Sequence, residues 1–176
     1  MNEAWIQTFS GRKFHLLDPH PSEVFIEDVA HALSLLCRYT GHVREFYSVA
    51  DHSVRVSQVC DPQDALAGLL HDASEAYLAD LNSPLKHSPE MSRYRTAERR
   101  VQTAIAERFG VPAKKPPSVE VADRRLLVTE KRDLLSPNGP EWEYYREFVP
   151  LPETIHPRTS AQAEQDFLAR FAQLSK

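Results

Sequence analysis

The sequence predicts an all-α fold with a small β-hairpin at its N-terminus, and three observations favour this class. Apolar residues recur at helical spacing in several segments, such as the one from Ile26 to Cys37. Helix start and stop signals separate these segments, including Asp61-Pro62 and Gly110. The chain has only 5 glycines, whereas a β-sandwich with many tight turns normally uses more.

Length and composition indicate one domain over residues 1–176. Hydrophobic residues make up 41% of the chain and charged residues 26%, which is ordinary for a globular protein of a size that buries a substantial core. We expect the core over about residues 26–135, an N-terminal hairpin over 5–17 and a C-terminal helical extension over 141–176.

Local signals predict each element in turn. Residues 5–9 and 13–17 flank Ser10-Gly11-Arg12 and are typical of a hairpin. Ser48 and Ser118 are suitable N-caps, and Ser88-Pro89 is a helix start. The apolar spacing then predicts helices over residues 26–39, 49–59, 62–78, 88–110, 119–135 and 142–148, and a last helix from residue 160.

Charge and hydropathy patterning exclude several classes of protein. The formal net charge is −4, whereas a duplex nucleic-acid partner calls for a basic face. The uncharged stretch 29–37 is far shorter than the roughly 20 residues of a membrane span, and residues 1–5 do not resemble a secretory signal. Cys37 and Cys60 are too few for a disulfide scaffold. We expect a cytoplasmic protein with no membrane or duplex nucleic-acid partner.

Polar residues occupy four positions that the helical pattern would otherwise bury: His52, His71, Asp72 and Asp123. A buried carboxylate without a partner is costly, so it is usually paired or bound to a metal. Two imidazoles and two carboxylates suit one divalent transition metal, such as manganese, cobalt, zinc or iron, with magnesium also possible. On an octahedral ion, four protein ligands leave two positions open for water and substrate.

Further polar residues lie close to this set in sequence. Glu75 is four residues after His71, so on a continuous helix both would share one face, and Glu75 could orient or deprotonate a metal-bound water. Asp80 and Lys86 follow, and a lysine beside a dication suits a phosphate. Arg38 and Tyr39, at the end of the first expected helix, are candidates for phosphate contact and base stacking. Taken singly, these residues are better explained as core or surface histidines, paired carboxylates or solvated charges, whereas their combination favours a site.

The pattern resembles the HD-domain metal-dependent phosphohydrolases. The matching strings are residues 49–53 (VADHS), 69–75 (LLHDASE) and 121–123 (VAD), which reproduce the order H…HD…D on three expected helices. The string 71–81 (HDASEAYLADL), followed by SPLK at 83–86, resembles the 5′-deoxynucleotidase branch of this superfamily.

The resemblance implies a helical bundle that hydrolyses phosphate esters or anhydrides of nucleotides. It assigns Glu75 to positioning the attacking water and Asp80 to the sugar and leaving oxygen. Arg38-Tyr39 resembles an arginine followed by an aromatic residue, here tyrosine rather than tryptophan. Lys86 is expected at the phosphate. The implied ligands of a single metal ion are His52, His71, Asp72 and Asp123.

Several functions fit this pattern. The first is a 5′-deoxynucleotidase, which converts a deoxynucleoside monophosphate to the deoxynucleoside and phosphate. A triphosphohydrolase would release triphosphate instead and would need more cations, for which Arg124, Arg125 and Lys131 are candidates. A metal-bound nucleotide sensor without turnover and a helical interaction domain that binds no metal are the remaining alternatives. By analogy with helical nucleotidases, we expect a homodimer or higher homo-oligomer.

Overall fold

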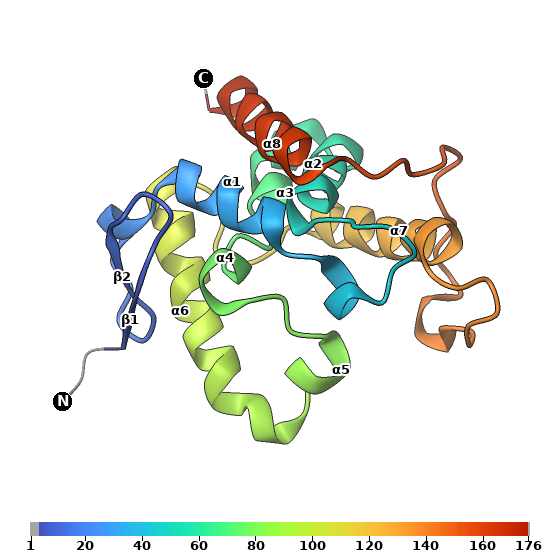
Figure 1. Ribbon diagram of the computed structural model, residues 1–176, viewed down its shortest axis with the longest axis horizontal. Coiled ribbons are helices and arrows are strands. Elements are labelled where there is room, and N and C mark those ends of the chain that lie inside the picture. The colour runs from blue at the N-terminus through green and yellow to red at the C-terminus, as the bar shows by residue number, and fades with distance from the viewer. Residues whose placement is uncertain (1–3, 176) are drawn as a thin grey trace.

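Eight α-helices and one two-stranded antiparallel sheet make up the described part of the computed structural model, residues 4–175. The expected class, mostly helical with a small hairpin, is therefore confirmed. The hairpin and α6 lie at one end of the molecule and α7 at the other, with α8 above α1 and α2 (Figure 1). Among the described helices, none is long and apolar enough to cross a membrane.

The hairpin consists of β1 (Trp5–Gln7) and β2 (Lys13–His15). Ile6 pairs with Phe14 in the ladder, and Gly11 takes the positive φ of +82° that the turn between the strands requires. Phe14 is fully buried and stacks on the ring of Tyr77, with the centroids 3.7 Å apart. The hairpin is thereby part of the core.

The first long helices frame an irregular connection. α1 (Ile26–Leu35) ends before residue 39, so the expected helix over 26–39 is wrong at its C-terminal end. The reason is that Cys37 forms a β-bridge with Ser48, and residues 38–41 make a 3₁₀ turn between them. α2 (Val49–Val59) begins as expected, because the hydroxyl of Ser48 accepts a hydrogen bond from the backbone N–H of residue 51.

The single helix expected over 62–78 is also wrong. The chain forms a 3₁₀ turn at Pro62–Asp64, then α3 (Ala65–Leu69), then turns over 70–74, and becomes helical again in α4 (Glu75–Leu78). At Leu70 the backbone leaves the helical region, with φ −101° and ψ 7°. Hydrogen bonds in the turn then join residues three apart, from 73 to 70 and from 75 to 72.

The second half of the chain follows its signals more closely. Gly110, with φ +69°, ends the helix expected over 88–110, whose first residues are instead a 3₁₀ turn at 89–91. The helix expected over 142–148 is wrong, since only a 3₁₀ turn forms at Glu143–Tyr145 after a non-helical residue 142. The remaining helices are α5 (Ser83–Lys86), where no helix was expected, α6 (Ser92–Phe109), α7 (Pro117–Leu134) and α8 (Ser160–Leu174).

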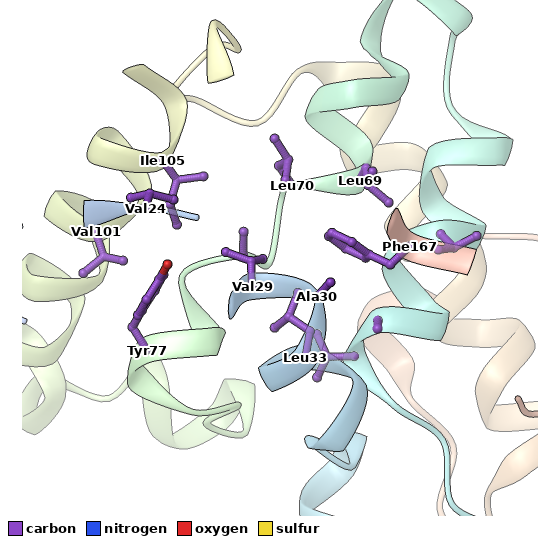
Figure 2. Close-up of a cluster of buried hydrophobic side chains, with 14 of the residues drawn as sticks. Val24, Val29, Ala30, Leu33, Leu69, Leu70, Tyr77, Val101, Ile105 and Phe167 are labelled. Atoms are coloured by element: carbon purple, nitrogen blue, oxygen red, sulfur yellow. The ribbon is translucent and has the colours of Figure 1, made fainter. Parts of the chain in front are cut away.

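Two apolar clusters hold these helices together. In the larger one, Phe167 of α8 lies among side chains of α1 and α3, including Leu33 and Leu69 (Figure 2). α8, expected as an extension, thus contributes to the main core. The smaller cluster joins α2 to α7 through residues such as Val56 and Leu126. The two clusters fix α2, α3 and α7 against one another, and the polar residues of the candidate site lie on α2, on α7 and on the chain that follows α3.

Candidate metal centre

The four expected metal ligands converge from three parts of the chain. His52 lies on α2, His71 and Asp72 on the turn between α3 and α4, and Asp123 on α7. Nε2 of His52 is 3.3 Å from Oδ1 of Asp123 and 3.7 Å from Oδ2 of Asp72. Nε2 of His71 is 3.0 Å from Oδ2 of Asp72 and 3.9 Å from Oδ2 of Asp123. Two imidazole nitrogens and two carboxylates therefore face one small volume.

The ring nitrogens of His52 and His71 are arranged as in a metal site. Nδ1 of His52 contacts Oε1 of Glu130 at 2.6 Å, and Nδ1 of His71 contacts the carbonyl oxygen of Gly68 at 2.8 Å. Metal-binding histidines are usually oriented by such contacts on the ring nitrogen that does not bind the ion. Both Nε2 atoms are buried and make no hydrogen bond. Ligand atoms of His52, His71 and Asp72 all lie within 4.8 Å of one another.

A proton on His52 would compete with a metal ion for the imidazole. Burial and the charge of Arg38 lower the pKa of His52, but Glu130 and Asp123 outweigh both and raise it to about 9. An ion at this centre would take the position of the Nε2 proton, so metal binding competes with protonation.

Glu130 on α7 is a central residue that the sequence analysis missed. Its side chain is fully buried, and Oε1 accepts hydrogen bonds from Tyr47, at 3.0 Å, and from His52. Burial opposes ionisation, yet the charges of Arg38 and His52 lower the pKa of Glu130 to about 2. A signal existed, because Glu130 follows Asp123 by two helical turns and so shares its face of α7.

Arg38 and Tyr39, which the sequence predicts at the substrate, donate hydrogen bonds to Glu130. Arg38 is buried in the 3₁₀ turn, and its Nη2 and Nε donate to Oε2 of Glu130 at 3.1 and 3.3 Å. Its Nη1 also lies 3.6 Å from Oδ2 of Asp72. Tyr39 has a positive φ of 56° and donates its hydroxyl to the same oxygen of Glu130. Residues strained in this way often occur at functional sites.

Glu75 lies close to the centre but not on a helix shared with His71, because the turn at 70–74 separates them. Its carboxylate is buried, and Oε2 has no hydrogen-bond partner. Lys86 lies 3.8 Å from Oε1 but donates to Glu98 at 2.8 Å. Burial and the charges of Asp72 and Asp80 raise the pKa of Glu75 well above its usual value.

Asp80 follows Ala79, which has a positive φ of 66°. Burial raises the pKa of Asp80, and among its charged neighbours Arg38 opposes this shift while Asp72 adds to it. Glu75 and Asp80 are thus two carboxylates near the ligand cluster whose environments both favour the protonated form. Such groups are suited to accepting and donating protons.

Comparison with known proteins places the chain in a family. It is 36% identical to the uncharacterized protein YfdR of Escherichia coli K12 over 175 residues, which cover 98% of this chain and 97% of YfdR. The chain belongs to the YfdR family. It is also 37% identical over 131 residues to the uncharacterized protein RCAP_rcc00048 of Rhodobacter capsulatus, covering 69% of this chain and 66% of that protein. No family model matches.

In this member of the YfdR family, the sequence analysis also missed Lys115, which contacts one of the expected ligands. Nζ of Lys115 contacts Oδ2 of Asp123 at 2.7 Å and lies 3.9 Å from Oε2 of Glu120. Lys115 belongs to the proline-bounded connection between α6 and α7, which its composition marks only as a rigid loop. Neither periodicity nor residue spacing in the sequence predicts a contact between this loop and Asp123.

The extra cations considered for a triphosphate have partners away from the four ligands. Arg124 forms an ion pair with Glu120 one turn before it, at 2.6 Å. Arg125 donates to the carbonyl of Val149 at 3.4 Å. The ammonium of Lys131 lies over the ring of Trp142, 5.5 Å from its centroid. The contacts of Arg125 and Lys131 anchor the segment after α7 to that helix.

Proposed function

We propose that this chain is a metal-dependent phosphohydrolase of the HD-domain type that acts on small deoxynucleotides. The observation that carries the proposal is the pair of buried Nε2 atoms of His52 and His71, which make no hydrogen bond and face the carboxylates of Asp72 and Asp123. Unsatisfied buried polar atoms are rare in folded proteins and call for an explanation such as an ion. The H…HD…D order of the sequence supports the same conclusion.

A divalent ion held by these four residues would polarise a phosphoryl oxygen and lower the pKa of its water. The chain's contribution to binding is orientation: Glu130 fixes the ring of His52, and the carbonyl of Gly68 fixes that of His71. Because both contacts come from buried groups, the two rings need little rearrangement when an ion enters.

Glu75 and Asp80 supply the proton transfers. In hydrolysis of a deoxynucleoside monophosphate, the water oxygen bonds to phosphorus and the bond from phosphorus to the 5′ oxygen breaks. Glu75 in its ionised form takes the proton of the water, and Asp80, whose raised pKa favours the protonated form, gives a proton to the departing 5′ oxygen. The products are the deoxynucleoside and orthophosphate.

A monophosphate is favoured over a triphosphate by the positions of the cations. Arg124, Arg125 and Lys131, the candidates for binding further phosphates, all have other partners. Lys86, expected at the phosphate, lies beside Glu75 and so remains near the centre.

The experiment is product analysis by chromatography. Protein loaded separately with manganese, cobalt, zinc or magnesium receives each deoxynucleoside mono- and triphosphate. We expect nucleoside plus orthophosphate from the monophosphates, no product with Asp72→Ala, and loss of turnover with retained metal in Glu75→Gln. Release of tripolyphosphate would move the protein to the triphosphohydrolases. Absence of product from metal-loaded protein would reject the enzyme and favour a sensor. Sedimentation equilibrium tests the expected self-association.

A further inference from the structure

Lys115 and His52 contact different oxygens of the Asp123 carboxylate. Oδ1 of Asp123 is the oxygen 3.3 Å from His52, whereas Oδ2 is the oxygen 2.7 Å from the ammonium of Lys115. An ion bound through Oδ1 would therefore leave the contact with Lys115 intact. The ammonium would then stand beside the ion without being a ligand.

The Lys115 ammonium has N–H groups that are available for a further acceptor. A lysine carries three N–H groups, and Asp123 accepts one of them. The other acidic neighbour, Glu120, lies at 3.9 Å, beyond hydrogen-bond distance. Arg38, by contrast, donates twice to Glu130. Lys86 also makes a single hydrogen bond, but to Glu98, which is not one of the four expected ligands.

Space is present next to Lys115 on the side of His71. Both residues line a cavity of about 70 Å³, together with Gln102 and the loop residues that precede α7. The amide of Gln102 donates to the carbonyl of Leu70, and its Oε1 is buried without a partner. The cavity is lined by apolar residues as well as these polar ones, and its volume is large enough to admit water. Lys115 is therefore not enclosed by packed side chains.

We propose that Lys115 is a phosphate-binding residue of this centre, whose ammonium binds a non-bridging oxygen of a phosphoryl group held at the metal ion. A divalent ion on Asp123 neutralises the carboxylate and weakens its attraction for the ammonium. A phosphate dianion at the same ion then becomes the stronger partner, and charge-assisted hydrogen bonds of this kind are the strong ones. The inference rests on the proposed function for the identity of the substrate, but phosphate binding is testable without turnover.

The test is calorimetric titration of inorganic phosphate into manganese-loaded protein. Lys115→Met removes the ammonium and keeps an unbranched side chain, and Lys114→Met is the matched control because Lys114 is the exposed neighbour. We expect Lys115→Met to raise the Kd for phosphate about tenfold or more, which corresponds to the net worth of one charged hydrogen bond. Lys114→Met should stay within twofold of the unsubstituted protein, Lys115→Arg should recover part of the affinity, and manganese content should be equal in all four proteins.

Two results would overturn the proposal. One is an unchanged Kd for phosphate in Lys115→Met; the other is loss of manganese in that variant, which would show that Lys115 only positions Asp123. The failure of the proposed function looks different, because phosphate binding would still depend on Lys115 while no deoxynucleotide is turned over. Where turnover is found, Lys115→Met should raise KM for the nucleotide more than it lowers kcat.

Discussion

Nδ1 of His52 lies 2.6 Å from Oε1 of Glu130, so that a buried carboxylate of α7 holds a buried imidazole of α2 beneath the candidate metal centre. Tyr47 donates to the same oxygen, and Arg38 and Tyr39 donate to the other. Glu130 is thus the acceptor that joins the irregular 38–41 segment, α2 and α7. Its removal should affect metal binding although it is not a ligand.

Glu130→Gln is the first prediction. The amide keeps the volume of the carboxylate but loses its charge and one of its acceptor oxygens, so it cannot hold His52 and Arg38 together. Loss of such a supporting group typically weakens metal binding by about 10- to 100-fold. Competition with a chromophoric chelator measures the change. The matched control is Glu141→Gln, since the side chain of Glu141 is 74% exposed and pairs only at the surface with Arg146. Equal affinities in the two variants would contradict the proposed role of Glu130.

The sequence predicted the long helices well. The prediction failed where the apolar residues keep helical spacing but the backbone is not helical. α2, α6, α7 and α8 follow the apolar spacing, and Ser48 and Gly110 cap α2 and α6 as expected. The expected cap Ser118 is wrong, because α7 already begins at Pro117. Residues 69–78 keep helical spacing and contain neither glycine nor proline, so nothing local announces the turn at 70–74.

The turn at 70–74 changes the directions of the His71 and Asp72 side chains. Neighbours on a straight helix point about 100° apart, which would send His71 and Asp72 in different directions. On the turn, Nε2 of His71 and Oδ2 of Asp72 come within 3.0 Å and face the same volume.

The candidate site was predictable only in part, for a related reason. The expected ligands are polar residues at buried positions of a helical pattern, which a sequence reveals. Glu130 was accessible by the same reasoning and was overlooked. Lys115 was not, because the path of its loop depends on how α6 and α7 pack. Its contact with Asp123 joins residues eight apart that are not on one helix.

Metal should stabilise the fold, which is the second prediction. An ion that binds only the folded state adds about 2.7 kcal/mol to the free energy of unfolding at a concentration of 100 times its Kd. Urea denaturation with and without manganese measures this. Asp72→Ala should abolish the gain, whereas Asp166→Ala, which alters a carboxylate that is 47% exposed, should retain it. The same gain in both variants would show that manganese binds elsewhere.

Phe167 offers a third prediction, on the role of α8. Its side chain is fully buried in the main cluster among residues of α1 and α3. Phe167→Ala should lower the free energy of unfolding by about 3–5 kcal/mol, the usual cost of deleting a buried aromatic ring. Tyr144→Ala is the control, because Tyr144 is 91% exposed and its loss should change stability by no more than about 0.5 kcal/mol. A loss below about 1 kcal/mol for Phe167→Ala would mean that α8 is not part of the cooperative core.

The fourth prediction concerns acid stability and Asp133, near the end of α7. One oxygen of this carboxylate accepts the backbone N–H of Ile155 at 2.9 Å, and both oxygens accept hydrogen bonds from Arg132. The hydrogen bonds from Arg132, aided by Ile155 and opposed by burial, lower the pKa of Asp133 below its usual value of 3.8. Asp133 therefore ties the segment before α8 to α7 in its ionised form.

The sign of the pH effect follows from that lowered pKa. As pH falls, the unfolded chain takes up the proton first, so the contribution of Asp133 is present in full above its unfolded pKa and is lost as pH falls through its folded value. Asp133→Asn should therefore lower the free energy of unfolding by about 1 kcal/mol near neutral pH. The difference from the unsubstituted protein should shrink on acidification below the usual pKa of 3.8. Urea titrations at a series of pH values measure it, with the exposed Asp18→Asn as control. If the difference did not change with pH, the ionised carboxylate would not be what holds Ile155, and packing of that segment alone would have to account for its position.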